Sequence, residues 1–207
     1  MQHAQTRSPE CSRGGVLERF ARCRRGVAAI EFGYIAPVMF LMFMGSLEFS
    51  RAITVDRRVT QVASSTADLI ARQTAVTDTD LSGYLQIVSH LLAPYSDAPL
   101  KLTVVSVTAD ASDDDTRVSW CYNRSVDVNG SSVSKGVHSY TSGAAYTLPD
   151  NIIGQGESVI VVEATYDYQP FIVSYFITTA RTFTETFYLK PRLSANVAKS
   201  TGSMDCT

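Results

Sequence analysis

One uninterrupted apolar run constrains this chain more than any other feature. The 16 residues Phe32–Leu47 (FGYIAPVMFLMFMGSL) carry no formal charge, and only Glu31 and Glu48 interrupt the longer stretch Val27–Phe49. A helix that crosses the roughly 30 Å hydrocarbon core of a bilayer needs about 20 mostly apolar residues. We therefore predict a single transmembrane helix over residues 27–49.

The charges on the two sides of this run differ in sign. Residues 1–25 contain six arginines and two glutamates, a net charge of +4, whereas the rest of the chain has 12 basic and 18 acidic side chains, a net charge of -6. Because basic residues stay on the cytoplasmic side of membranes, we expect a cytoplasmic N-terminus and a periplasmic body on a bacterial inner membrane. The overall charge of -2 lacks the basic excess of nucleic-acid-binding proteins, so we expect no nucleic-acid partner.

Three other interpretations of the apolar run stay open. A cleaved secretory signal has a shorter apolar core, about 7–15 residues, followed by a small-residue cleavage site. Here the run continues into Glu48-Phe49-Ser50-Arg51, which offers no such site. The second interpretation is a buried core helix, and the third is a membrane anchor without further chemistry.

Glu31 is unusual in this run, because desolvating a carboxylate without a partner costs free energy. It follows Arg24-Arg25-Gly26 and the small or apolar residues Val27-Ala28-Ala29-Ile30, and Phe32 comes next. This order of residues at the start of an apolar helix resembles a prepilin peptidase site. The longer string GVAAIEFGYIAPVMFLMFMGSLEFSRA, with Pro37 six residues after Glu31, resembles the TadE-like family, minor pseudopilins of the tight-adherence (Flp) pilus system.

The resemblance implies a processing site in the first residues of the match. A membrane prepilin peptidase would cut between Gly26 and Val27, where glycine has no side chain to obstruct the approach to the backbone. The leader that it removes contains Arg22, Arg24 and Arg25, which would hold it at the anionic inner surface of the membrane.

The resemblance also implies that Glu31 and Phe32 act in assembly. Glu31 would pair with the free Val27 ammonium of a neighbouring subunit, because a charge pair in low dielectric costs less than an isolated carboxylate. Alternatively, Glu31 reaches the inner interface or stays protonated. Pro37 lacks an amide hydrogen and is expected to kink the helix, unless it is an ordinary transmembrane proline.

The implied partners are the prepilin peptidase, other pilins and minor pseudopilins, inner-membrane pilus assembly proteins and the lipid bilayer. Major Flp pilins are little more than the helix, so an exterior body of about 150 residues indicates an accessory subunit. Type IV major pilins usually begin their mature form with phenylalanine, and this chain would begin with Val27. TadG-like relatives have longer exterior regions, and the sequence does not separate a TadE role from a TadF role.

Hydrophobic periodicity predicts an α+β body. We divide the chain into a leader (1–26), the transmembrane helix (27–49), a helical stalk with a second helix (50–98) and an exterior β-rich domain (99–207). The membrane helix is expected to continue as an amphipathic stalk to about Gln73. Leu81, Leu85, Val88 and Leu92 predict the second helix, with caps in Thr77–Asp80.

Beyond Pro99 the period changes toward two, which is typical of strands. We predict strands at 100–104, 118–122, 160–168 and 182–189, of which 160–168 has the clearest half-buried alternation. Segments 109–116 and 129–157 are rich in glycine, serine and aspartate and predict loops, and 171–180 fits a strand or a helix. Two helices packed on a small antiparallel sheet follow from this pattern.

Cys121 and Cys206 would both lie outside the membrane, in an oxidising compartment, and we predict that they pair. The pair would close a loop of about 85 residues and contribute roughly 4 kcal/mol in the chain-entropy model. Two free thiols are the alternative. Cys11 and Cys23 belong to the leader and would stay reduced.

The sequence predicts no enzyme, no cofactor and no metal. His3, His90 and His138 are scattered, and neither a G-x-S-x-G nor an H-E-x-x-H motif occurs. A calcium site is the alternative to a solvated turn for the four aspartates Asp110, Asp113, Asp114 and Asp115.

Two functions follow. The chain is either a minor pseudopilin needed for assembly of a tight-adherence (Flp, type IVb) pilus, or an uncleaved single-pass module that binds or senses in the periplasm. The two functions differ in the fate of the bond between Gly26 and Val27.

Overall fold

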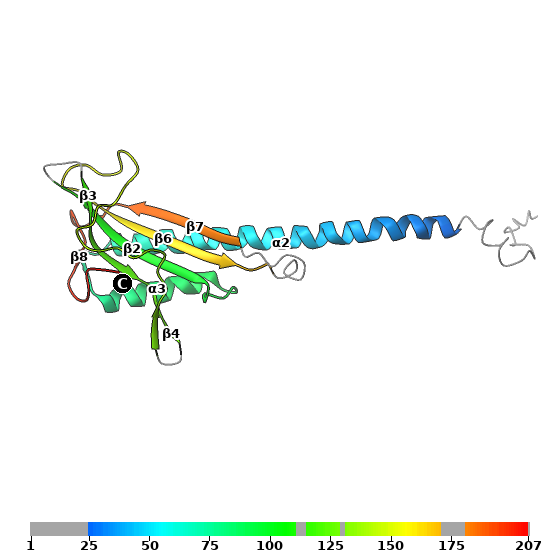
Figure 1. The fold of residues 1–207 in the computed structure, drawn as a ribbon, viewed down its shortest axis with the longest axis horizontal. Coiled ribbons are helices and arrows are strands. Elements are labelled where there is room, and N and C mark those ends of the chain that lie inside the picture. Colours follow the sequence, from blue (N-terminus) through cyan, green and yellow to red (C-terminus); the bar gives the residue numbers. More distant parts are fainter. Residues whose placement is uncertain (1–24, 111–114, 129–130, 171–180, 207) are drawn as a thin grey trace, which may run out of the picture. The chain divides into compact units, whose positions relative to one another are not determined.

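The computed structural model describes residues 25–110, 115–128, 131–170 and 181–206. It has two compact units, Met1–Leu47 and Glu48–Thr207. Helix α2 (Arg25–Ala71) is 47 residues long and contributes to both units (Figure 1). Residues 1–24, which include Arg22 and Arg24, and the ambiguous segment 171–180 lie outside the described residues.

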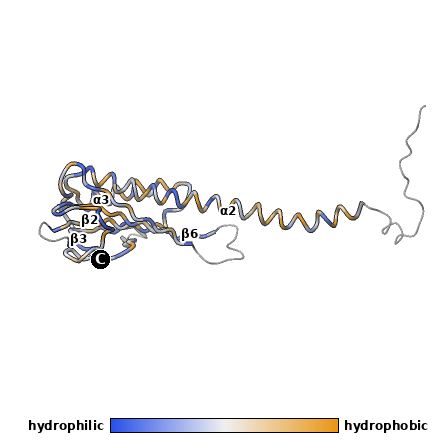
Figure 2. Tube along the Cα trace, turned by 90° about the horizontal axis from the view of Figure 1, so that it is seen from above, coloured by the Kyte–Doolittle hydropathy of each residue, from blue (hydrophilic) through white to orange (hydrophobic). Residues whose placement is uncertain are grey.

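The described part of the first unit is the N-terminal half of α2, which continues through Pro37. Its large side chains are exposed, with Phe32 72% and Met42 71% accessible, and Figure 2 shows apolar residues throughout this half. None of its most apolar 18-residue window is buried inside the protein, and the helix is long and apolar enough to cross a membrane. This exposure contradicts the interpretation as a buried core helix and fits a membrane-anchored protein.

The second half of α2 is amphipathic and forms one layer of the second unit. Its fully buried side chains follow each other at helical spacing, three or four residues apart or directly adjacent. They are Val55, Val59, Val62, Ala63, Thr66, Ala67, Ile70 and Ala71. The helix ends at Ala71, close to the predicted end of the stalk.

The predicted second helix is α3 (Asp78–Ser89), followed by a 3-10 turn, η1 (His90–Leu92). Thr77 is its N-cap, because the Thr77 hydroxyl accepts a hydrogen bond from the Asp80 amide at 3.1 Å and the Asp80 carboxylate accepts one from the Thr77 amide at 3.0 Å. This reciprocal capping box satisfies backbone donors that the first turn leaves unpaired. The apolar face of the helix is buried, as its spacing predicts.

An antiparallel sheet forms the second layer. Its strands are β2 (Leu100–Ala109), β3 (Thr116–Asn123), β6 (Ser158–Tyr168) and β7 (Arg181–Leu189), in the order β3-β2-β6-β7. Figures 1 and 2 show α3 and the second half of α2 along one face of this sheet, where the main apolar core lies. The α+β architecture and the four predicted strands are confirmed.

The C-terminal tail contacts both faces of the sheet, since Val197 belongs to the main core, whereas Cys206 packs in a second apolar cluster with residues of a long loop such as Tyr140 and Tyr146. Cys121 on β3 and Cys206 form a disulfide across 85 residues of sequence, and Trp120 Nε1 donates a hydrogen bond to the Val197 carbonyl at 2.7 Å. Lys199, in the tail, is buried, and its Nζ lies 2.9 Å from Asp78 Oδ1. These contacts attach the tail to β3 and to the start of α3.

Two expectations are wrong in detail. The segment 129–157 is not all loop, because β5 (Ser131–Ser134) forms a hairpin with β4 (Ser125–Val128). Strand β6 is not half-buried, because ten of its 11 residues are buried. A short parallel pair, β1 (Ala75–Val76) with β8 (Ala198–Lys199), was not expected.

Candidate functional site at the N-terminal end of helix α2

The residues of the predicted processing site lie in the first turn of α2. The helix begins at Arg25, so Gly26 and Val27 are its next two residues. The Val27 side chain is 53% exposed. The amides of a first helical turn have no hydrogen-bond partner within the helix.

Glu31 lies one turn after Val27 on the same helix, a spacing of four residues that places the two on one face. Both Glu31 and Phe32 are exposed. None of the described residues forms an ion pair with Glu31. The apolar half of α2 therefore presents one carboxylate within its first two turns.

Glu48 has a role that the sequence analysis missed. Its side chain is 7% exposed and accepts a hydrogen bond from the Tyr168 hydroxyl at the end of β6. Burial, and next the hydrogen bond to Glu48, raise the pKa of the Tyr168 phenol. This contact joins the first residue of the second unit to the sheet, and the only sequence signal for it is an acidic residue at the end of an apolar run.

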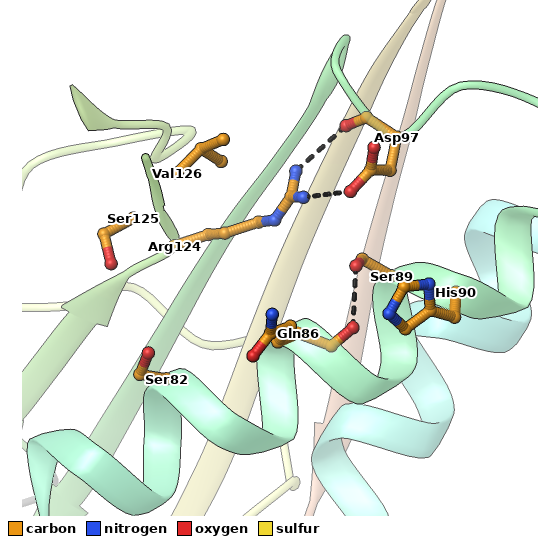
Figure 3. A pocket seen from close by; sticks show the side chains of 8 residues that line it. All are labelled: Ser82, Gln86, Ser89, His90, Asp97, Arg124, Ser125 and Val126. Carbon is orange, nitrogen blue, oxygen red and sulfur yellow. Dashed lines mark hydrogen bonds and ion pairs between the residues drawn. The ribbon is translucent and has the colours of Figure 1, made fainter. Parts of the chain in front are cut away.

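A polar cavity of about 400 Å³ is a second candidate site (Figure 3). Ser82, Gln86 and His90 line it from the helical layer, and Arg124 and Asp97 line its other side. The Arg124 guanidinium already donates to the Asp97 carboxylate at 2.5 Å and to the Asp97 and Leu100 carbonyls at 2.9 and 3.0 Å. These contacts already engage the Arg124 guanidinium within the protein.

Metal binding finds no support in the described part of the chain, where no three His, Cys, Asp or Glu side chains gather. Of the four aspartates considered for calcium, Asp113 and Asp114 lie outside the described residues. Asp115 forms an ion pair with Arg117 at 3.3 Å.

A comparison with protein families finds a match for most of helix α2. Residues 26–68 match the model of the TadE-like protein family. These residues are TadE-like. The TadE-like segment begins at Gly26, contains Glu31, Pro37 and Glu48, and ends three residues before the end of α2. No curated protein and no solved structure matches the chain.

A TadE-like segment implies a role in the tight-adherence (Tad/Flp) pilus system and contact with proteins of that system. It also fits a membrane-anchored protein, in agreement with the exposed apolar helix. The sheet lies outside the TadE-like segment, so this identification rests on α2 alone.

Proposed function

We propose that this chain is a minor pseudopilin needed for assembly of a tight-adherence (Flp, type IVb) pilus. In this proposal a prepilin peptidase cuts after Gly26, and the mature chain assembles through its N-terminal helix. The observation that carries the proposal is the TadE-like match over residues 26–68, which begins at the residue before the proposed cut. The role is one of interaction, without catalysis.

The position of the proposed cut follows from the chemistry of a helix end. Gly26 has no side chain to obstruct a peptidase, and the first turn that contains it lacks internal hydrogen bonds to hold its amides. A new amino terminus at Val27 would carry a positive charge at the positive end of the helix dipole. Two like charges at one helix end are unfavourable, so the new ammonium favours a nearby anion.

Glu31 supplies that anion. It is exposed, lies one turn from Val27 and has no ion-pair partner among the described residues. In hydrocarbon, an unpaired carboxylate and an unpaired ammonium are both costly, and pairing reduces the cost of each. We assign the pairing to Glu31 of one subunit and Val27 of the next, which would set the register of the helices.

The proposed location is the bacterial inner membrane, with residues 1–26 in the cytoplasm and the second unit in the periplasm. Partners are the prepilin peptidase, other pilins and minor pseudopilins, and the inner-membrane assembly proteins. The basic leader and the positive-inside rule support this orientation.

Two variants test the processing step in cells that carry the pilus system. Gly26→Leu is expected to leave the leader attached and to abolish pilus assembly. Gly33→Leu is the matched control, because a side chain at Gly33 meets no atom within 4 Å, and this variant is expected to be processed normally. Normal pili with Gly26→Leu would favour the uncleaved periplasmic module instead.

Two further variants test the assembly role of Glu31. Glu31→Ala is expected to permit cleavage but to reduce incorporation with other pilus subunits. Glu31→Asp keeps the negative charge and is expected to retain part of the incorporation. Co-purification of the processed chain with pilus subunits measures this. Equal incorporation of the Ala and Asp variants and the unchanged chain would refute the pairing.

A further inference from the structure

The two edge strands of the four-stranded sheet, β3 and β7, differ in how many backbone hydrogen bonds their outer edges make with the described residues. The outer edge of β3 is covered, since its backbone exchanges hydrogen bonds with the loop at Gly143 and Ala144 at 2.8 and 2.9 Å, and Cys121 donates to the Met204 carbonyl at 3.0 Å. The outer edge of β7 has no such cover from the described residues, because β6 alone pairs with it.

Strand β7 has few of the features that protect an open edge. Natural edge strands are kept from pairing by prolines, bulges, short length or charged side chains, especially lysines, and the charged residues of β7 are Arg181 at its start and Glu185 at its centre. Over Arg181–Leu189 the strand has no proline, glycine or lysine, and its register with β6 is unbroken for nine residue pairs. The pairing of β2 with β3, by contrast, contains a register shift.

An apolar groove of about 610 Å³ lies beside this strand. Its apolar lining comes from β7 and the helical layer, namely Phe187, Leu189, Ile87 and Leu91. The small side chains of Ser64 and Ser65 on α2 also line it. Ile87 is 65% exposed although it is large and apolar. A strand added to β7 would place alternate side chains on the side of the sheet where this groove lies.

The charges of β7 disfavour a second copy of this chain as the added strand. Full antiparallel pairing of β7 with itself would centre on Glu185 and place two like charges directly opposite each other, which is destabilising. A shift that brings Arg181 opposite Glu185 would leave only the residues 181–185 paired. The partner that fits the whole strand has a basic residue opposite Glu185.

We propose that an extended strand of another protein pairs with β7 and extends the sheet. The partner strand has apolar residues beside Phe183 and Phe187 and a basic residue opposite Glu185. This inference deepens the proposed assembly function and rests on it for the source of the strand, a pilus-system protein on the same side of the membrane.

The test uses the full-length chain in cells that carry the pilus system. A photoreactive phenylalanine analogue replaces Thr184 or Thr186, which are exposed on the sheet face away from the helices. We expect both probes to cross-link to one other protein, at partner residues that lie two positions apart. The matched control replaces Arg117 on the covered edge, where the cross-link should go to the chain's own loop near Ala145.

Glu185→Lys, combined with the probe at Thr184, is expected to reduce the cross-link yield about five-fold, because it changes an attractive cross-strand pair into a repulsive one. An intact disulfide between Cys121 and Cys206 verifies that each variant is folded. Cross-links with the two-residue spacing that weaken with Glu185→Lys support the proposal.

Three outcomes would overturn it. Cross-links to a second copy would assign the edge to self-association, cross-links to residues 171–180 would assign it to the chain's own segment, and no cross-link would show an unoccupied edge. The mass of the chain in the same samples reports whether the leader has been removed, so the test of the partner strand and the test of the proposed processing have separate readouts. A processed chain without cross-links refutes the partner strand alone, whereas cross-links to a chain that keeps its leader refute processing alone.

Discussion

At the scale of single residues, Glu163 on β6 shows how far an alternating pattern can mislead. The pattern places it on the polar side of a half-buried strand, yet it is 5% exposed. Tyr140 and Tyr146 donate hydrogen bonds to Glu163 Oε1 at 2.7 and 3.0 Å, and His138 Nδ1 lies 2.7 Å from Oε2. The three partners belong to the segment 129–157, which the sequence predicts as a loop. The spacing of residues within β6 therefore could not predict that this segment packs over Glu163.

We predict that Tyr146→Phe lowers the free energy of unfolding by about 1–2 kcal/mol, because it removes a hydrogen bond to a buried carboxylate. Tyr188→Phe is the matched control. Tyr188 packs in the same apolar cluster, and its hydroxyl has no hydrogen bond to the described residues, so the change should stay below about 0.5 kcal/mol. Denaturant unfolding measures both, and equal losses would contradict the role of Glu163.

The same tyrosines predict a loss of stability at alkaline pH. Burial, together with the charge of Glu163, raises the pKa of the Tyr146 phenol, and burial and the hydrogen bond to Glu163 raise that of Tyr140. An unfolded tyrosine loses its proton near pH 10, where the folded one still keeps it. Stability is therefore fully present below about pH 10 and declines as the pH rises further.

Thermal unfolding between pH 8 and pH 11 measures this decline. Tyr146→Phe should show a shallower decline than the unchanged chain, because it has one fewer proton to release on unfolding. Parallel curves for the two proteins would mean that Tyr146 ionises equally in both states.

At the scale of elements, local patterns predicted the helices and the central strands well. The apolar spacing along α2 and α3, the caps before α3 and the alternation in β2, β3, β6 and β7 are all properties of contiguous residues. Strands of two to four residues (β1, β4, β5 and β8) are too short to produce a period. Burial of both faces of β6 depends on a distant loop, and no local pattern reports it.

The capping box of α3 gives a prediction for one element. Thr77→Ala should lower the free energy of unfolding by about 1 kcal/mol, because the Asp80 amide loses its acceptor. Thr79→Ala, an exposed position two residues further on, is the control and should be neutral or slightly stabilising. Chemical denaturation compares the two variants, and an equal effect of both would contradict the cap.

At the scale of the whole molecule, the disulfide between Cys121 and Cys206 links the C-terminal tail covalently to β3. Replacing Cys121 and Cys206 by serine should lower the free energy of unfolding by about 4 kcal/mol, because the bond closes a loop of 85 residues. Replacing Cys11 and Cys23 instead should leave the stability of the second unit unchanged. Thermal melting with and without reductant measures this, and insensitivity to reductant would contradict the contribution of the bond.

The candidate site was predictable to the extent that it is contiguous. Gly26, Val27, Glu31 and Phe32 lie within seven residues of sequence, and the TadE-like match contains all four. The contact of Glu48 with Tyr168 joins residues 120 positions apart, and the open edge of β7 depends on the order of four strands. Features of the second kind follow from the tertiary fold and have no signature in one stretch of sequence.

The intact mass of the membrane-extracted protein, from cells with and without the prepilin peptidase, decides whether the bond between Gly26 and Val27 is cut. We expect a chain that begins at Val27 when the peptidase is present and a chain that keeps residues 1–26 when it is absent. A chain that keeps its leader in both cells would refute the proposed processing and leave an uncleaved membrane-anchored module. A cut after the apolar run would contradict the membrane anchor itself.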